Sequence, residues 1–312
     1  MMSAVEYLPS FQHASTRVDG DLMKAITRTI AYADVFDYPL TIDEIHRRLV
    51  GTPASRAAVE HTICAAQAAS RPFISVCNYY MLRGRGSLVA TRRRRAQVAA
   101  RLWPAARRYG ARIARLPFVR MVAVTGALAV DNVEPDADID YLIVTKPGRL
   151  WLCRAMIVAM VRIAARSGHV LCPNYLITED ALEIRERSLY TAHELAQMVP
   201  LAGWPTYRRM RLINQWMADY LPNAPLATDI DYATTTSHTA KVLAEAILNT
   251  AAGGWIEQWE MQRKIQKLMA QATPGDEIAF CADWCKGHFG RHGTRTLGAF
   301  DARLAAIGGY QP

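Results

Sequence analysis

The sequence of 312 residues has no acidic side chain between Arg83 and Arg120, a stretch that contains 12 arginines. Residues 1–120 hold 19 Lys and Arg against 8 Asp and Glu, whereas residues 121–312 hold 18 against 20. The net charge of +9 therefore comes entirely from the first 120 residues. Because arginine suits bidentate contacts with phosphate or carboxylate, this half predicts a phosphate-rich partner or an acidic protein.

Long apolar runs and several common motifs are also missing. The longest apolar stretch, residues 150–165, is interrupted by Arg154 and Arg162 and is shorter than the roughly 20 residues of a membrane span. Neither a Gly-x-Ser-x-Gly elbow nor a Gly-x4-Gly-Lys-Ser/Thr loop occurs, which argues against typical serine hydrolases and P-loop proteins. The first residues lack the features of a signal peptide. We therefore predict a cytoplasmic protein that has no membrane partner.

Cysteine is scarce, at six residues, and a chain of this length buries enough surface to fold without disulfides. Cys281 and Cys285 lie close in sequence to His288 and His292. This spacing leaves open a zinc site or a segment that binds no metal, and it is not a usual zinc-finger pattern.

The first 90 residues read as three short helices followed by a β-hairpin. Thr41 and Glu44 form the Ser/Thr-x-x-Glu pattern of a capping box, which predicts the start of the second helix. Residues 73–82 are predicted as one strand that returns over residues 87–91. This order is typical of a winged helix-turn-helix, which we predict for residues 20–92.

The rest of the chain predicts two further domains and an α+β fold. Residues 93–180 alternate between helices and apolar strands, whereas residues 181–312 are mainly helical in pattern. The elements expected in the middle domain are a basic helix over 92–114, strands over 119–125 and 139–144, a helix over 150–167 and a strand over 169–178.

Asp138 and Asp140 flank Ile139 at the start of an apolar strand. Alternate side chains on a strand share a face, so the two carboxylates are expected to point the same way. Two adjacent negative charges repel and lose solvation, and a divalent cation removes that cost. Because Mg²⁺ takes one or two protein carboxylates together with substrate phosphates, the pair predicts a Mg²⁺ or Mn²⁺ site.

Gly126 follows the preceding strand, between Thr125 and Ala127. A residue without a Cβ lets the backbone approach a phosphate closely, and free N–H groups at a helix start also favour an anion. We predict these three residues as a nucleotide-binding segment. Lys146, after the acidic strand, is a further candidate for contact with phosphates.

This arrangement resembles the DNA polymerase beta-like nucleotidyltransferase superfamily over roughly residues 94–178. The family motif is a hydrophobic residue with Gly-Gly or Gly-Ser, followed after a loop by Asp-hydrophobic-Asp/Glu. Gly126-Ala127 and Asp138-Ile139-Asp140 match it. The resemblance implies transfer of a nucleoside monophosphate from an NTP to an acceptor hydroxyl, with Asp138 and Asp140 as catalytic metal ligands. The acceptor class, a small molecule, a protein or an RNA, stays open.

The sequence departs from the family pattern at two positions. Ala127 keeps the backbone amide but lacks the serine hydroxyl. On the last predicted strand Asn174 stands where many members have a third carboxylate, and asparagine cannot act as a base. Glu194 and Asp136 are the other candidates for that base.

An alternative function follows from these departures. The chain would then be a non-catalytic nucleotidyltransferase fold with a binding or regulatory role. It would contact nucleic acid or a protein partner through its basic N-terminal half, with Arg92–Arg95 on nucleic-acid phosphates. Replacement of either Asp138 or Asp140 should abolish turnover by an enzyme, whereas nucleic-acid binding through the arginines should not change.

Overall fold

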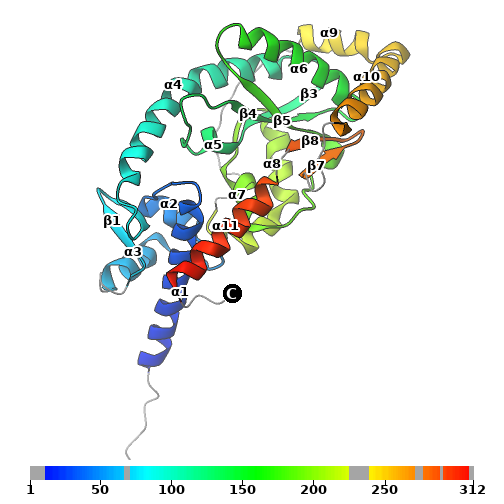
Figure 1. Ribbon diagram of the computed structural model, residues 1–312. Coiled ribbons are helices and arrows are strands. Elements are labelled where there is room, and N and C mark those ends of the chain that lie inside the picture. Colours follow the sequence, from blue (N-terminus) through cyan, green and yellow to red (C-terminus); the bar gives the residue numbers. More distant parts are fainter. Residues whose placement is uncertain (1–10, 67–70, 225–238, 271–276, 289–290, 309–312) are drawn as a thin grey trace, which may run out of the picture. The chain divides into compact units, whose positions relative to one another are not determined.

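The computed structural model describes residues 11–66, 71–224, 239–270, 277–288 and 291–308, and it is a mixed α+β structure (Figure 1). The chain divides into two compact units. The terminal unit comprises residues 1–89, 219–224 and 299–312, and the sheet unit comprises residues 90–218 and 225–298. Among the described helices, none has the length and apolar character that crossing a membrane requires.

The terminal unit has a core made by helices and one hairpin. Its elements are α1 (Phe11–Asp34), α2 (Ile42–Arg47), α3 (Arg56–Ala65), β1 (Phe73–Val76), β2 (Tyr79–Leu82) and the last turns of α11 (His292–Ile307). Ile26, Ile45, Ile63 and Phe73 come from four of these elements and are all almost fully buried. The capping box at α2 is confirmed, since Thr41 Oγ1 accepts the Glu44 N–H and the Glu44 carboxylate accepts the Thr41 N–H.

The hairpin lies at a different place from the one predicted. Cys77 and Asn78 both have positive φ angles, of 50° and 64°, and form a two-residue turn inside the run that was expected to be a single strand. Such turns match the twist of the paired strands, and asparagine tolerates this backbone region. The segment expected to return as a strand instead begins α4 at Leu88.

A buried carboxylate of α1 binds the last turns of α11 to the rest of the terminal unit. Asp34 is 5% exposed, at the end of α1. Arg303 Nε donates to Asp34 Oδ2 at 2.8 Å, and Arg85 Nε donates to Asp34 Oδ1 at 3.1 Å. A buried charge is tolerated only when it is paired in this way. The pairing therefore joins the C-terminal helix to the first helix of the chain.

The sheet unit is built on a mixed β-sheet with the strand order β6-β3-β4-β5-β8-β7. Only the β4–β5 pair is parallel, and every other neighbouring pair is antiparallel. Its strands are β3 (Val119–Val124), β4 (Ile139–Thr145), β5 (Leu171–Thr178), β6 (Val199–Ala202), β7 (Glu277–Phe280) and β8 (Trp284–His288). Its helices are α4 (Leu88–Ala114), α5 (Gly126–Ala129), α6 (Leu150–Ala165), α7 (Leu189–Gln197), α8 (Trp204–Ile213), α9 (Thr239–Leu248) and α10 (Ala251–Met269).

The described residues after 181 are mainly helical, as expected, but they also contain three short strands that the sequence did not predict. Strands β6, β7 and β8 each have only four or five residues, and they pair with β3, with β8 and with β5. Strands this short carry little periodicity of their own. Their backbone hydrogen bonds come from neighbours more than 70 residues away in the case of β6 and β8, so local pattern could not reveal them.

The two faces of β4 have different environments. Ile139, Tyr141 and Ile143 are fully buried in the core that α4 and α6 share, as predicted. The Tyr141 hydroxyl donates to the Ala106 carbonyl of α4 at 2.7 Å. Successive residues of a strand point to opposite sides, so Asp140 faces away from this core.

Helix α6 begins with a cap supplied by α10. Arg149 at its start makes no side-chain capping bond. Instead the buried Glu257 carboxylate accepts the Trp151 N–H at 2.9 Å and the Leu152 N–H at 2.7 Å. A carboxylate at a helix N-terminus satisfies orphan donors and complements the helix dipole. Glu257 thereby fixes α10 against α6.

Replacing this capping residue tests its contribution to the fold. Glu257→Ala leaves two buried N–H groups without an acceptor, so the free energy of unfolding should fall by about 2 kcal/mol. Urea denaturation measures the change. Gln258→Ala, at an exposed position of the same helix, is the matched control and should change stability little. Equal losses in the two variants would contradict the cap.

Candidate functional site

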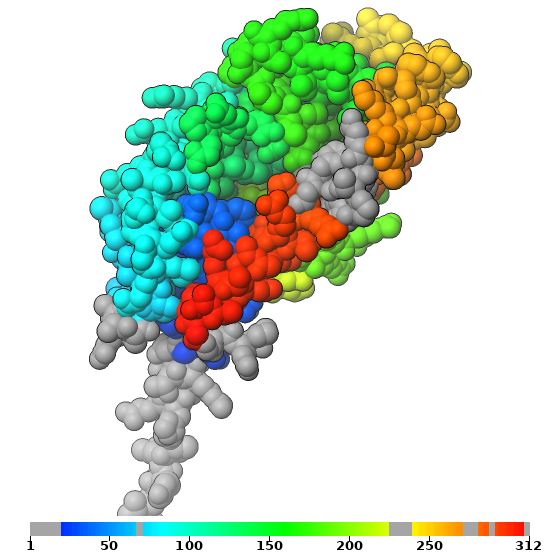
Figure 2. Space-filling view, viewed as in Figure 1, coloured from blue at the N-terminus to red at the C-terminus, as the bar shows by residue number. Residues whose placement is uncertain are grey.

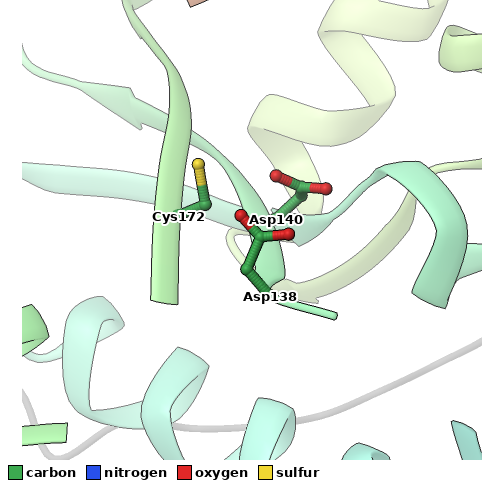
Figure 3. A group of neighbouring side chains, drawn as sticks. All are labelled: Asp138, Asp140 and Cys172. Carbon is green, nitrogen blue, oxygen red and sulfur yellow. The ribbon is translucent and has the colours of Figure 1, made fainter. Parts of the chain in front are cut away.

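Asp138, Asp140 and Cys172 form one cluster at the start of β4 and β5 (Figure 3). One possible ligand atom of each lies within 4.8 Å of those of the others, and Asp138 is the most exposed of the three. The parallel register pairs Asp140 directly with Cys172, which explains why the thiol meets the carboxylates. The predicted convergence of the two aspartates on one side is confirmed.

The cluster is electrostatically costly without a cation. Burial first, and then the negative charges of Asp138 and Glu194, raise the pKa of Asp140 to about 7, against a hydrogen bond from Cys172 that lowers it. Burial and the two carboxylates also raise the pKa of the Cys172 thiol far above its usual range. The thiol therefore stays protonated and serves as a hydrogen-bond donor.

Gly126 makes room for Asp140. Its φ angle is +64°, which favours glycine, and a Cβ at this position would lie 2.6 Å from Asp140 Oδ2. The Thr125 N–H donates to the Asp140 carbonyl at 3.0 Å, so the two segments are held together. The glycine and the second aspartate of the motif are thus one packed unit, with Ala127 next along the short helix α5.

Asn174 and Glu194 lie beside the acid cluster. Asn174 Nδ2 donates to Asp140 Oδ1 at 3.3 Å. Burial raises the pKa of Glu194 on α7 to about 7, although Gln197 Nε2 donates to its carboxylate at 2.7 Å and Lys286 contributes an attractive charge. Both candidates named from the sequence are therefore placed near Asp140.

A pocket with a cavity volume of about 60 Å³ opens at this side of the sheet. Its polar lining includes Thr125, Asn174, Glu194 and Lys286. The remainder is predominantly apolar, with contributions from β4, α7 and α8. A small, mostly apolar pocket with a few convergent polar groups is the usual form of a ligand site.

Lys146 is not placed with the cluster. It follows the last residue of β4, whereas Asp140 is near the first, so about 20 Å of strand separates them. Its ammonium group donates to Asn249 Oδ1 at 3.4 Å and lies over the Phe118 ring. Asp136 is exposed in the loop before the strand and is not part of the cluster.

The arginine run at the start of α4 has internal partners. Arg92 is buried and donates to the carbonyl oxygens of Val130 and Asp131. Arg95 Nε donates to Glu134 Oε1 at 2.7 Å, and Arg94 makes a longer ion pair with the same carboxylate. Three of the four predicted phosphate contacts thus hold the loop between α5 and β4 instead.

Cys172 is the cluster residue that sequence reasoning missed. A usable signal was present, because Cys172 and Asn174 alternate on a strand that follows a helical crossover from β4. Such a crossover makes the two strands parallel neighbours, and their polar positions then meet at one edge. This signal did not show which residues of β4 and β5 are paired with each other.

The residues fit Mg²⁺ or Mn²⁺ better than a softer metal. Proteins commonly bind Mg²⁺ through one or two carboxylates, and water and phosphate oxygens complete its coordination shell. Cys172 would be a ligand only as a thiolate, a softer donor than the oxygen ligands that Mg²⁺ and Mn²⁺ prefer. Within the described ranges no second group of three such side chains comes as close, and the His288 side chain of the Cys281–His292 segment lies outside the described residues.

Comparisons with protein-family models, with curated proteins and with solved structures find no match to this chain.

The raised pKa of Asp140 predicts a pH-dependent stability. The folded state holds this proton up to about pH 7, whereas the unfolded chain loses it near its ordinary pKa of 3.8. In metal-free buffer the free energy of unfolding should therefore fall between about pH 4 and pH 7. Asp140→Asn removes this cost and should stabilise the protein at pH 8 by on the order of 1–3 kcal/mol.

Urea denaturation at pH 4.5 and pH 8 measures the effect, and Asp136→Asn serves as the exposed control. A stability gain of equal size at both pH values, or a loss at pH 8, would contradict the assignment.

The close approach of Gly126 and Asp140 predicts a difference between two glycine substitutions. Gly126 and Gly148 both have positive φ, at +64° and +69°, but a Cβ at Gly148 meets nothing within 4 Å. Both alanine variants carry backbone strain of about 1–2 kcal/mol. Gly126→Ala should be less stable than Gly148→Ala by a further 1–3 kcal/mol or so, because it also collides with Asp140. Equal unfolding midpoints in urea would refute the contact.

Proposed function

We propose that this chain is a Mg²⁺- or Mn²⁺-dependent nucleotidyltransferase with a polymerase beta-like core. It would transfer a nucleoside monophosphate from an NTP to an acceptor hydroxyl. The observation that supports this proposal is the packing of Gly126 against Asp140, with Asp138 alongside, between consecutive strands of one sheet. A phosphate-approach glycine and two metal-binding carboxylates are the parts that such a reaction requires at one place.

The roles of the side chains follow from their surroundings. Asp138 and Asp140 would hold the metal, which when bound polarises the α-phosphate and neutralises charge on the triphosphate. Binding the cation also offsets the repulsion that raises the pKa of Asp140. Asn174 holds the Asp140 carboxylate in position through its amide. The backbone amides at Gly126 and Ala127 would face the phosphates, while the missing Cβ at Gly126 leaves room for the Asp140 carboxylate beside them.

Glu194 is the best-placed group to accept the proton of the acceptor hydroxyl. It lines the pocket beside the acid cluster, and its pKa of about 7 suits a general base at neutral pH. Apolar side chains of the same pocket exclude water from it, which is why the pKa is raised. We propose that this pocket receives the hydroxyl-bearing part of the acceptor.

The terminal unit is proposed to be a winged helix-turn-helix in a cytoplasmic protein. Three helices followed by a two-stranded hairpin support this proposal. On the third helix, Arg56 forms ion pairs with Asp43 and Glu60, which occupy its guanidinium group and compete with contacts to DNA bases. A role in packing or in contacts with a partner fits the module better than sequence-specific DNA binding.

A non-catalytic role remains the second candidate. It is favoured by Asn174 at the position of a third carboxylate, and by Glu194 lying outside the group formed by Asp138, Asp140 and Cys172. In this version the site would bind a nucleotide without transferring it.

Calorimetric titration of each NTP tests the proposed site. In the presence of Mg²⁺ or Mn²⁺ the wild-type protein should bind an NTP, and Asp138→Asn should weaken binding by at least about tenfold, because a metal-binding carboxylate is lost. Omitting the metal should have a similar effect. Asp136→Asn is the matched control, since it makes the same substitution at an exposed loop position and should bind normally.

Failure of the folded wild type to bind any NTP would contradict both the catalytic and the non-catalytic version of the nucleotide site. Metal-dependent NTP binding without pyrophosphate release, for every acceptor class offered, would favour the non-catalytic version.

A further inference from the structure

Helix α4 carries a second set of arginines that no internal acid neutralises. The helix has no acidic residue, and the arginines that come after the Arg92–Arg95 run are exposed. Together with the exposed Arg93, this set consists of Arg93, Arg101, Arg107, Arg108, Arg112 and Arg115, and we name it the arginine face. None of the six forms an ion pair with an acidic side chain in the described ranges. They therefore offer charge to an external partner.

The six arginines lie on one side of the helix. At 100° per residue they fall within an arc of about 140°, opposite the buried residues Ala106 and Ile113. Arg101, Arg108 and Arg115 recur at intervals of seven residues, a rise of roughly 10 Å each. The side chains of α4, cyan to turquoise, reach the molecular surface in Figure 2. The result is a linear cationic surface along the helix.

Aromatic rings hold half of these guanidinium groups in place. Arg107 lies over the Trp103 ring at 5.4 Å, while Arg108 and Arg112 both lie over the Tyr109 ring, at 5.1 and 5.4 Å. The Trp103 ring is itself fixed by a hydrogen bond from Nε1 to Asp131 Oδ1 at 2.8 Å. Stacking orders a guanidinium group without using its N–H donors, so the donors stay available for an anion.

We propose that the arginine face binds the phosphodiester backbone of a nucleic acid. From Arg93 to Arg112 the helix extends about 28 Å, which matches roughly eight base pairs of a duplex at 3.4 Å per pair, and Arg115 follows directly after the last residue of the helix. Binding would be independent of base sequence, because the face carries charge but few side chains of the kind that read base edges.

The composition of the face favours a nucleic acid over an acidic protein. Protein interfaces have an apolar centre with aromatic anchors. No large apolar side chain of α4 is strongly exposed, and the exposed residues between the arginines include Gln97, Ala100 and Pro104. An evenly charged surface without an apolar centre fits a polyphosphate backbone.

The arginine face does not depend on the proposed nucleotidyl transfer. Helix α4 packs on the face of β4 that holds Tyr141, whereas Asp140 points to the other face. A nucleic acid bound along α4 thus contacts residues other than the acid cluster. Nucleic-acid binding and NTP binding can be measured and lost separately.

Fluorescence anisotropy with labelled RNA and DNA, single-stranded and duplex and of about 20 nucleotides, tests the proposal between roughly 50 and 200 mM salt. The test variant is the triple substitution Arg101→Gln, Arg108→Gln and Arg115→Gln. The control is Arg162→Gln, Arg166→Gln and Arg209→Gln, which removes the same charge at three exposed positions on or next to α6 and α8.

The wild type should bind at least one of these nucleic acids, with an affinity that falls steeply as salt rises. The test variant should bind about 10- to 100-fold more weakly, and the slope of log affinity against log salt should become shallower by about 2–3. The control and Asp138→Asn should bind like the wild type.

Three results would overturn the proposal. The first is no binding to any of the nucleic acids at the lowest salt. The second is an equal loss of affinity in the test and control variants, which would mean that net charge alone acts. The third is binding of poly-glutamate that is as tight and as dependent on Arg101, Arg108 and Arg115, which would assign the face to acidic proteins.

Discussion

The candidate site depends on the register of the single parallel strand pair, β4 with β5. That register sets Asp140 opposite Cys172 and brings Asn174 to the same carboxylate. A shift of one residue would turn these side chains toward the core that α4 and α6 fill. The crossover through α6 fixes the direction of the pair, and the cap from Glu257 holds the start of that helix.

Charge is distributed unevenly in this protein, and the structure uses the unevenness in two ways. Acidic side chains of the second half accept hydrogen bonds from backbone N–H groups and pair with arginines of the same chain. Glu245 accepts the Phe118 N–H and pairs with Arg120, and Glu257 caps α6. Arginines near the start of α4 hold the loop before β4, while those farther along remain exposed. The same residue type thus stabilises the loop and forms the proposed binding surface.

The acid cluster makes the fold less stable than a neutral site would. Asp138 and Asp140 are held together by strand geometry, and burial together with the neighbouring negative charges raises the pKa of Asp140. Gly126 adopts a backbone conformation that few other residues accept, so the site requires glycine here. Functional sites commonly carry such strain, because binding of the ligand removes it.

The sequence by itself determined the strongly periodic parts: the capping box at Thr41, the basic helix, the strands around Val119 and Ile139, and the shared side of Asp138 and Asp140. These features rest on interactions within a few residues. Only the tertiary structure decided the hairpin turn at Cys77, the short strands of the second half, the partners of Arg92–Arg95 and the meeting of Cys172 with Asp140. Each of these depends on pairing between distant segments, and the local pattern of side chains contains neither the partner nor the register.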